Sequence, residues 1–252
     1  MHIKMSINSL SELYTGELVS CSGSGSIKLW KMKGNSFTLK EVLDNGSGYG
    51  VHMCIPIKRN RMASCSYGPN IIIWRSTFPY LQIKTLKGHK DNVQALLELP
   101  NLDLLISTST DGLIKFWNTN SFNCDLTIKN PRPFGITLMK DIGNDRFAIS
   151  FDDDEHGTVM IINAKTHVYD IYHTYYYKEN DENTVLSMVM LDNWSILCGC
   201  SDGRACRLNL IDGKTDYKTK DFLHKEAITS MLPYGQRLFL TAEKTSIKLW
   251  QY

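Results

Sequence analysis

A regular spacing of large apolar residues constrains this 252-residue chain more than any other feature. Short β-type runs end at Trp or another large apolar residue, and the successive intervals between these ends are 44, 43, 45, 46 and 42 residues. The six ends are Trp30, Trp74, Trp117, Ile162, Leu208 and Trp250. A period of roughly 20–50 residues is typical of repeat folds, in which each unit packs on its neighbours. The chain is therefore predicted to contain six copies of one structural unit.

Each copy has the composition of an antiparallel β-sheet. Short runs of alternating or β-branched residues are separated by Gly, Asn, Asp and Pro, and no long stretch has the 3.6-residue period of an amphipathic helix. The run 93–99 also fits two turns of helix, but Pro100 favours a strand that ends there. Tight turns are predicted at Gly68-Pro69 and at Asp111-Gly112.

The third unit carries the most complete pattern. It contains Gly88-His89, a core strand, a Ser-rich strand over 104–110, the Asp111-Gly112 turn and an apolar strand that ends at Trp117. With this motif the chain resembles the WD-repeat (WD40) β-propellers over essentially its whole length. The Asp that usually follows the Trp is absent, and polar residues stand there instead: Lys31, Arg75, Asn118, Asn163, Asn209 and Gln251.

The resemblance implies an all-β, WD40-type propeller with six blades of about 44 residues in one domain, residues 1–252. The expected blades are approximately 1–44, 45–87, 88–129, 130–172, 173–221 and 222–252. The chain stops two residues after Trp250, so the last blade is expected to lack its outer strand. We interpret the chain as part of a longer protein; the alternative for the fold is a fragment of a seven-bladed ring.

The resemblance also implies a structural tetrad in the third unit. His89, Ser107 or Ser109, Asp111 and Trp117 are expected to form a buried hydrogen-bonded chain, because such groups are costly to bury unpaired. A Ser–His–Asp set is also the composition of a hydrolase triad. Ser109, however, lacks the Gly-x-Ser-x-Gly context of a nucleophile elbow. We therefore predict a structural role and no catalytic residue.

Units four to six depart from the pattern. Unit four has an expanded turn over 151–157, and unit five keeps Ser201-Asp202-Gly203 but ends at Leu208. Unit six regains His224 and Trp250, while Lys244 stands where the turn Asp is expected.

Charge and hydropathy argue against several classes of protein. The net charge of +2 is weak and the basic residues are spread along the chain, so no nucleic-acid partner is predicted. The one compact basic group, 58–61, is interpreted as a solvated turn on the bottom face. No apolar run approaches the roughly 20 residues that cross a bilayer, and residues 1–5 do not form a signal peptide.

Seven cysteines are present, and Cys21, Cys65, Cys198 and Cys200 occupy strand positions where the third unit has small residues. We interpret them as reduced and buried, because a free thiol behaves as a small apolar group. Cys198-Gly199-Cys200 has no second pair at zinc-site spacing. No metal and no cofactor are predicted. The expected location is the cytoplasm, with the nucleus as an alternative.

A partner is expected on the face that carries the loops between blades and the middle turn of each unit, called here the top face. The residues two before each first-strand anchor should ring its mouth: Lys4, Tyr49, Asp91, Phe134, Asn183 and Glu226. Two aromatic residues in a polar ring suggest a binding site, since aromatic residues are enriched at binding hot spots. The alternative is that both pack on neighbouring loops.

Two acidic loops should lie on the same face. They contain Asp152, Asp153, Asp154, Glu155 and the adjacent His156 in one blade, and Glu179, Asp181 and Glu182 in the next. A negative sector of this kind steers a partner with a basic segment. A solvated loop and a divalent-cation site remain open as alternatives, although the spacing fits no calcium loop.

These patterns indicate a non-catalytic scaffold that binds a protein or peptide on the top face. An alternative is the substrate-recognition module of a larger enzyme assembly, such as a ubiquitin ligase or a kinase. A further alternative is a hydrolase that uses the central mouth, with His156 and nearby carboxylates as acid–base groups. The oligomeric state and the identity of the partner stay open.

Overall fold

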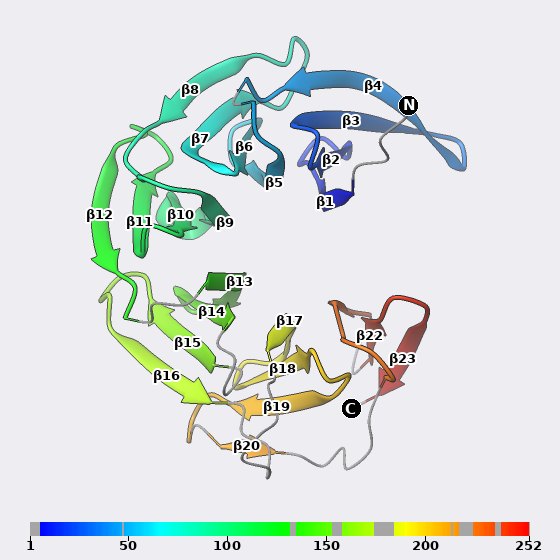
Figure 1. The fold of residues 1–252 in the computed structure, drawn as a ribbon, viewed down its shortest axis with the longest axis vertical. Helices are drawn as coiled ribbons and strands as arrows, with labels where there is room; N and C mark the ends of the chain where they lie inside the picture. Colours follow the sequence, from blue (N-terminus) through cyan, green and yellow to red (C-terminus); the bar gives the residue numbers. More distant parts are fainter. Residues whose placement is uncertain are drawn as a thin grey trace. The chain divides into compact units, whose positions relative to one another are not determined.

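The computed structural model describes residues 6–46, 48–131, 135–152, 158–173, 184–212, 214–216, 224–234 and 238–251. Side chains are not described at positions 137, 152, 169, 171–173, 215, 216 and 251. The chain divides into two compact units, Met1–Pro133 and Phe134–Tyr252, and each is treated separately. Figure 1 shows the strands of both units.

Unit 1 consists of three four-stranded antiparallel sheets. The first holds β1 (Ile7–Glu12), β2 (Leu18–Ser22), β3 (Ser26–Lys33) and β4 (Ser36–Asp44). The second holds β5 (Val51–Ile57), β6 (Arg61–Ser66), β7 (Gly68–Arg75) and β8 (Gln82–Leu86). The third holds β9 (Val93–Leu99), β10 (Leu104–Ser109), β11 (Leu113–Asn118) and β12 (Cys124–Lys129).

The described residues of unit 2 form two four-stranded sheets and one of three strands. The fourth sheet of the chain holds β13 (Gly135–Gly143), β14 (Arg146–Asp152), β15 (Thr158–Asn163) and β16 (Tyr169–His173). The fifth holds β17 (Val185–Asp192), β18 (Ser195–Cys200), β19 (Ala205–Asn209) and β20 (Thr215–Asp216). The sixth holds β21 (Ser230–Pro233), β22 (Leu238–Ala242) and β23 (Ile247–Gln251).

The predicted fold class is confirmed: an all-β propeller arrangement of six blades, the last with three strands. In each blade the strands pair in chain order, and the residue that ends each repeat pairs with the start of the second strand. Trp30 pairs with Leu18, Trp117 with Leu105 and Ile162 with Phe147. The spacing seen in the sequence therefore marks one structural position.

The run 93–99 forms strand β9, and its pairing with β10 ends next to Pro100, where the short 3-10 turn η1 (Pro100–Leu102) begins. The strand interpretation is correct, because Pro has no N–H to continue the ladder. Of the described residues, no helix is long or apolar enough to span a membrane.

The hydrophobic core of unit 1 lies between successive blades. Ile71, Ile73 and Cys65 of the second blade pack with Val93 and Trp117 of the third, and all of these side chains are buried. Inner strands of adjacent blades are also joined by polar contacts, such as the Cys54 amide donating to Ser9 Oγ at 3.3 Å. The second blade is buried on both faces, because Ile72 and Trp74 pack with the first blade while Ile71 and Ile73 pack with the third.

The turn predicted at Gly68-Pro69 is wrong. Both residues belong to β7, and Ser66 pairs directly with Gly68, so the connection is the single residue Tyr67. A register shift between Cys65 and Ser66 accommodates this very tight connection. The Gly-Pro pair was a misleading turn signal, because Pro is tolerated near the start of a strand.

Candidate functional site

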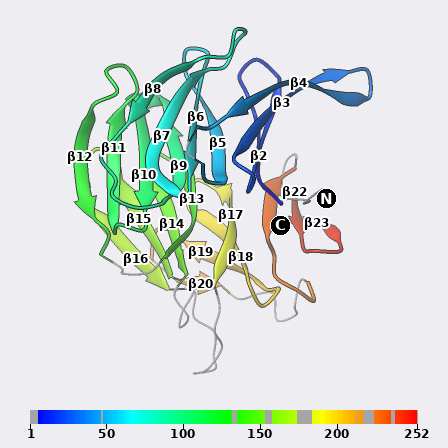
Figure 2. The same cartoon turned by 45° about the horizontal axis from the view of Figure 1, so that its top comes forward.

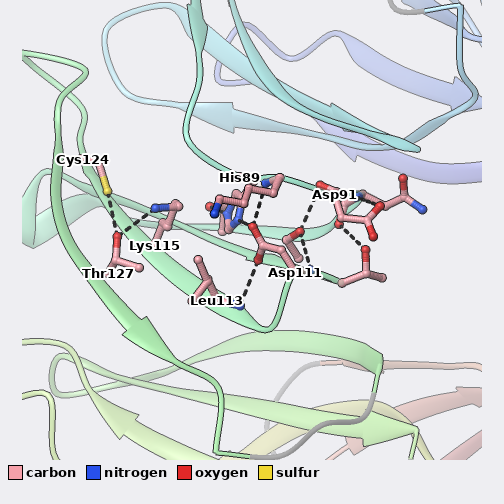
Figure 3. Close-up of polar contacts among 12 residues, drawn as sticks. His89, Asp91, Asp111, Leu113, Lys115, Cys124 and Thr127 are labelled. Carbon is pink, nitrogen blue, oxygen red and sulfur yellow. Dashed lines mark hydrogen bonds and ion pairs between the residues drawn. The ribbon is translucent and has the colours of Figure 1, made fainter.

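The third blade contains a continuous hydrogen-bonded chain from the β11 tryptophan to the loop before β9. Figure 3 shows its His89–Asp111 end. Trp117 Nε1 donates to Ser107 Oγ at 2.8 Å, Ser107 Oγ lies 2.8 Å from His89 Nε2, and His89 Nδ1 lies 2.9 Å from Asp111 Oδ2. Asp111 also accepts from the amides of Lys90 and Leu113, each at 2.9 Å. The chain joins three separate segments of one blade.

The donors and acceptors of this chain fit a neutral imidazole. An ionised Asp111 accepts a hydrogen bond from the protonated Nδ1 of His89. The unprotonated Nε2 then accepts a hydrogen bond from the Ser107 hydroxyl, and the Ser107 oxygen accepts one from the Trp117 indole N–H. Burial lowers the pKa of His89 below its usual value, and the Asp111 carboxylate opposes this shift without reversing it. For Asp111, burial raises the pKa, but the Lys90 amide, His89 and the Leu113 amide outweigh it, and the pKa is lowered.

The Ser107–His89 and His89–Asp111 distances are in the range found in a hydrolase triad, yet a substrate cannot reach the Ser107 hydroxyl. Ser107 has 0% of its surface exposed, and its hydroxyl is already engaged by Trp117 and His89. A nucleophile needs an accessible oxygen next to an oxyanion site. The arrangement is a structural bracket, in which each polar group satisfies the next.

Ser109 has a separate task in the same blade. Its hydroxyl donates to the Asp91 carbonyl at 3.0 Å and accepts from the Asp111 amide at 3.1 Å. It therefore holds the β10–β11 turn against the loop that precedes β9, while Ser107 completes the bracket. Buried Lys115 was not singled out in the sequence; its Nζ donates to Thr127 Oγ1 at 2.9 Å, and its charge also lowers the pKa of His89.

The indole–hydroxyl pair recurs wherever a blade ends in Trp. Trp30 donates to Ser20 and Trp74 to Ser64, both at 2.8 Å, and Trp250 donates to Thr241 at 2.7 Å. The other two blades have apolar residues at both positions, Ile149 with Ile162 and Cys198 with Leu208. Donor and acceptor are lost together, which leaves no unsatisfied group.

In the sixth blade the bracket is rebuilt with a different acid. His224 Nε2 lies 2.6 Å from Thr241 Oγ1, and Glu243 Oε2 accepts from the amides of Lys225 and Glu226 at 3.1 and 2.9 Å. Glu243 thus takes the place of the turn Asp, one residue before Lys244, and the longer side chain covers the offset. Hydrogen bonds from Ser246 and from the Glu226 amide lower the pKa of Glu243 to about 2. In the sequence only Lys244 was considered for this position, so the role of Glu243 was missed.

All seven cysteines are free thiols, and six of them are buried. Cys198 pairs across the ladder with Cys206, and both lie in the core of their blade. Within the described ranges no group of three or more His, Cys, Asp and Glu side chains could hold a metal ion.

Tyr49, His52 and Tyr67 lie close together in unit 1 and are called here the aromatic platform. The rings of His52 and Tyr67 have centroids 3.8 Å apart. A Cβ at Gly68 would lie 3.3 Å from the Tyr49 ring, and a Cβ at Gly50 would lie 3.0 Å from the Tyr67 ring. Each tyrosine therefore packs over the glycine that follows the other, yet Tyr49 is still 55% exposed.

The loop before β9 joins the platform to the third blade. The Tyr67 amide donates to the Gly50 carbonyl at 3.1 Å, and with its amide suitably oriented Asn92 donates to the Tyr67 carbonyl at 2.8 Å. Asp91, the adjacent residue, is exposed. Tyr67 and His52 were missed in the sequence, although the repeated Tyr-Gly pairs 49–50 and 67–68 were a usable signal.

Of the other predicted top-face residues, the structure describes only Glu226 and the backbone of Asp152. Glu226 is exposed in unit 2, next to the sixth-blade bracket. Asp152 ends β14, and only its backbone is described. The remaining predicted positions lie outside the described residues: Lys4, Phe134, Asp153, Asp154, Glu155, His156, Glu179, Asp181, Glu182 and Asn183.

The basic group at 58–61 is largely used within the fold. Lys58 Nζ donates to the Pro100 carbonyl, and Arg61 donates to the carbonyls of Lys58 and Thr119 at 2.9 and 2.6 Å. The Arg61 guanidinium also lies 5.0 Å from the Phe122 ring centroid and is buried. Two of its three charges therefore tie the second blade to the third.

Comparison with known proteins agrees with this fold. The WD40 family model (WD domain, G-beta repeat) matches residues 81–118. Human dynein axonemal assembly factor 10 is 21% identical over 91% of this chain and 70% of its own length. A striatin homolog of Dictyostelium discoideum is 29% identical over 35% of this chain, and nudF of Aspergillus flavus is 30% identical over 42%.

The matched region spans only 11% of the striatin homolog and 24% of nudF. Among solved structures, U3-55K has a TM-score of 0.80 at 18% identity, covering all of this chain and 79% of that one. A chain of the mitotic checkpoint complex has a TM-score of 0.79 at 17% identity, covering all of this chain and 76% of that one. At these identities the likeness is one of fold. The family match over residues 81–118, the repeated blade and the hydrogen-bonded bracket together show a WD40-type repeat in a chain with the fold of WD40 propellers.

Proposed function

We propose that the chain is a non-catalytic interaction scaffold that binds a protein or peptide partner on its top face. The aromatic platform carries this proposal. The Tyr49 and Tyr67 rings lie close to Gly68 and Gly50, His52 packs on the Tyr67 ring, and both tyrosines present large exposed surfaces. Pre-ordered aromatic side chains bury much area at little entropic cost, so they are common binding hot spots.

The chemistry around the platform supports a partner with a basic segment. Asp91 is exposed beside the loop that contacts Tyr67, and a carboxylate next to an aromatic surface favours Lys or Arg. The acidic residues Asp152–Glu155, Glu182 and Glu226, which the sequence predicts for the top face of their own blades, favour a basic segment for the same chemical reason. Basic partners associate faster with such a surface at low salt.

The burial of Ser107 supports a scaffold function over a hydrolase function. The Ser107–His89–Asp111 set lies inside the third blade, where no substrate carbonyl can approach Ser107. The hydrolase alternative must then depend on His156 and the carboxylates near it. Nothing in the geometry of the described residues favours that alternative.

The second candidate function is a substrate-recognition module within a larger enzyme assembly, such as a ubiquitin ligase or a kinase. It uses the same surface and differs only in what the bound protein undergoes next. The name of the human relative, dynein axonemal assembly factor 10, supports a role beside other proteins. We place the protein in the cytoplasm, with the nucleus as the alternative, because all seven cysteines are free.

The test is quantitative affinity purification of the tagged protein with the Tyr49→Ala/Tyr67→Ala variant. We expect the double variant to lose at least one partner that the wild-type protein retains. Retention of this partner by the wild-type protein should weaken as the salt concentration rises. The matched control is Tyr234→Ala, since Tyr234 in unit 2 is 55% exposed, as Tyr49 is. An unchanged set of partners in the folded double variant would refute the top-face site.

A further inference from the structure

We propose that the β3–β4 hairpin of the first blade is a second docking element, which adds an acidic, strand-forming segment of another protein to its free edge. This surface is separate from the aromatic platform. The hairpin is longer than a blade requires. Its ladder continues past Trp30 through the pairs Lys31–Thr38, Met32–Phe37 and Lys33–Ser36. In the other two blades of unit 1 the corresponding ladders end at Trp74–Gln82 and Trp117–Cys124.

The added pairs stand clear of the blade. Figures 1 and 2 show the β3–β4 tip extending beyond the other strands of its sheet. All residues from 31 to 40 are exposed. A Gly34 φ of 61° closes the two-residue turn, a conformation that glycine adopts without strain. The extension is well formed but buries almost nothing of its own.

One side of the extension is apolar. Trp30 pairs with Leu39 and Met32 pairs with Phe37, and residues two apart on a strand share a face. Phe37 is 46% exposed, and Met32 and Leu39 are more exposed still. By contrast, the tryptophans of the next two blades are almost fully buried against the blade that precedes each. An exposed apolar face of this kind marks an interaction surface.

The charge of the segment defines the partner. The hairpin Ser26–Asp44 contains four lysines, at 28, 31, 33 and 40, and its two acidic residues, Glu41 and Asp44, lie at the end of the ladder away from the tip. Lys40 is paired with Glu17 at 2.5 Å, at the root of the hairpin. Lys31 and Lys33 are exposed near the tip, on the two sides of Met32. A partner with carboxylates beside its apolar residues complements this pattern.

The free edge favours a protein over a membrane. Strand β4 is the outermost of its sheet, so one row of its N–H and C=O groups is available to a further strand. A partner strand satisfies these groups and covers the apolar face in the same step. A bilayer cannot satisfy them, and open sheet edges do not enter hydrocarbon. Strand β4 has nine residues, which sets the length of the segment.

The probe is a phage-displayed library of random nine-residue peptides, selected on the wild-type protein and counter-selected on the Met32→Ser/Phe37→Ser variant. We expect enriched peptides to be acidic, free of proline and alternately apolar. Synthetic copies should bind the double variant at least tenfold more weakly, and Lys31→Glu/Lys33→Glu should weaken binding similarly. Hydrogen exchange should show protection of β4 amides on binding.

The matched control is Ile83→Ser, because Ile83 is 45% exposed on the outer strand of the next blade, where no long hairpin exists. This variant and Tyr49→Ala/Tyr67→Ala should bind the peptides as the wild type does, which separates this surface from the proposed top-face function. The proposal is overturned if no acidic peptide is enriched, or if binding survives in both hairpin variants. It is equally overturned by hairpin-dependent binding to vesicles of phosphatidylcholine and phosphatidylserine, or by hairpin-dependent dimerisation.

Discussion

At the two positions of the indole–hydroxyl pair, each blade has either both polar partners or two apolar side chains. Four blades combine an indole N–H with a hydroxyl two residues past its ladder partner, and two blades replace both groups with apolar side chains. A buried donor without its acceptor costs about 1–3 kcal/mol, so replacement of one partner alone would destabilise the blade. Divergence at these positions therefore preserves the fold without preserving the motif.

The first prediction concerns Ser107. Ser107→Ala leaves the Trp117 indole N–H and His89 Nε2 without their partner inside the blade. The expected loss is about 2–4 kcal/mol of unfolding free energy, from two unsatisfied buried groups. Urea denaturation measures it. In a Trp117→Phe background the same change should cost less, because one of the two groups is already gone; strict additivity would contradict the bracket.

The second prediction concerns pH. Because burial lowers the pKa of His89 in the folded protein, its stabilising effect is complete above the unfolded pKa of about 6.5 and is lost as the pH falls below it. The Tm should fall between pH 7 and pH 5, and His89→Gln should reduce that dependence. His167→Gln, on an exposed turn, is the control. Equal pH dependence in wild type and His89→Gln would show that His89 does not contribute.

The third prediction concerns the acid of the sixth blade. The pKa of Glu243 is lowered to about 2, so its contribution is present above an unfolded pKa of about 4.3 and is lost as the pH falls toward 2. Glu243→Gln should lower the Tm at neutral pH, and the difference from wild type should shrink in acid. Lys244→Ala, one position on and exposed, should have little effect. A larger fall in Tm for Lys244→Ala than for Glu243→Gln would instead make Lys244 the residue that holds the turn.

At the scale of the element, the sequence predicts strands better than their surroundings. The segments Ser26–Trp30 and Ser246–Trp250 are identical; the first lies in strand β3, and all of the second except Ser246 lies in β23. Ile27 is nevertheless completely buried, while Ile247 is 73% exposed. The second blade packs on the face that Ile27 occupies. Local pattern encodes the strand, but the neighbouring sheet determines whether its face becomes core.

The fourth prediction uses this identical pair. Ile27→Ala should cost about 2–5 kcal/mol, as is usual when a buried aliphatic side chain leaves a cavity. Ile247→Ala should change the unfolding free energy by less than about 0.5 kcal/mol. Chemical denaturation of both variants tests the contrast within one protein. Equal losses would mean that the sixth blade is as well covered as the first.

For the whole molecule, the repeat spacing predicted the six blades, and the position of Trp250 two residues from the end of the sequence led to the expectation of a three-stranded last sheet. It could not locate the aromatic platform completely, because Tyr67 and His52 reach Tyr49 only through the one-residue β6–β7 connection and its glycines. The role of Glu243 was also not evident from the sequence, because it lies one residue before the position of the expected turn Asp and its longer side chain makes the equivalent hydrogen bonds. Both failures concern loops, where small backbone differences decide which side chains meet.

The central claim is that the preserved bracket stabilises the fold while the platform binds the partner. The most direct measurement is the dissociation constant of a purified partner for the Tyr49→Ala/Tyr67→Ala protein, at a temperature where circular dichroism shows it folded. We predict binding at least tenfold weaker than for the wild type, with Tyr234→Ala unchanged. An unchanged dissociation constant in the folded double variant would contradict the claim.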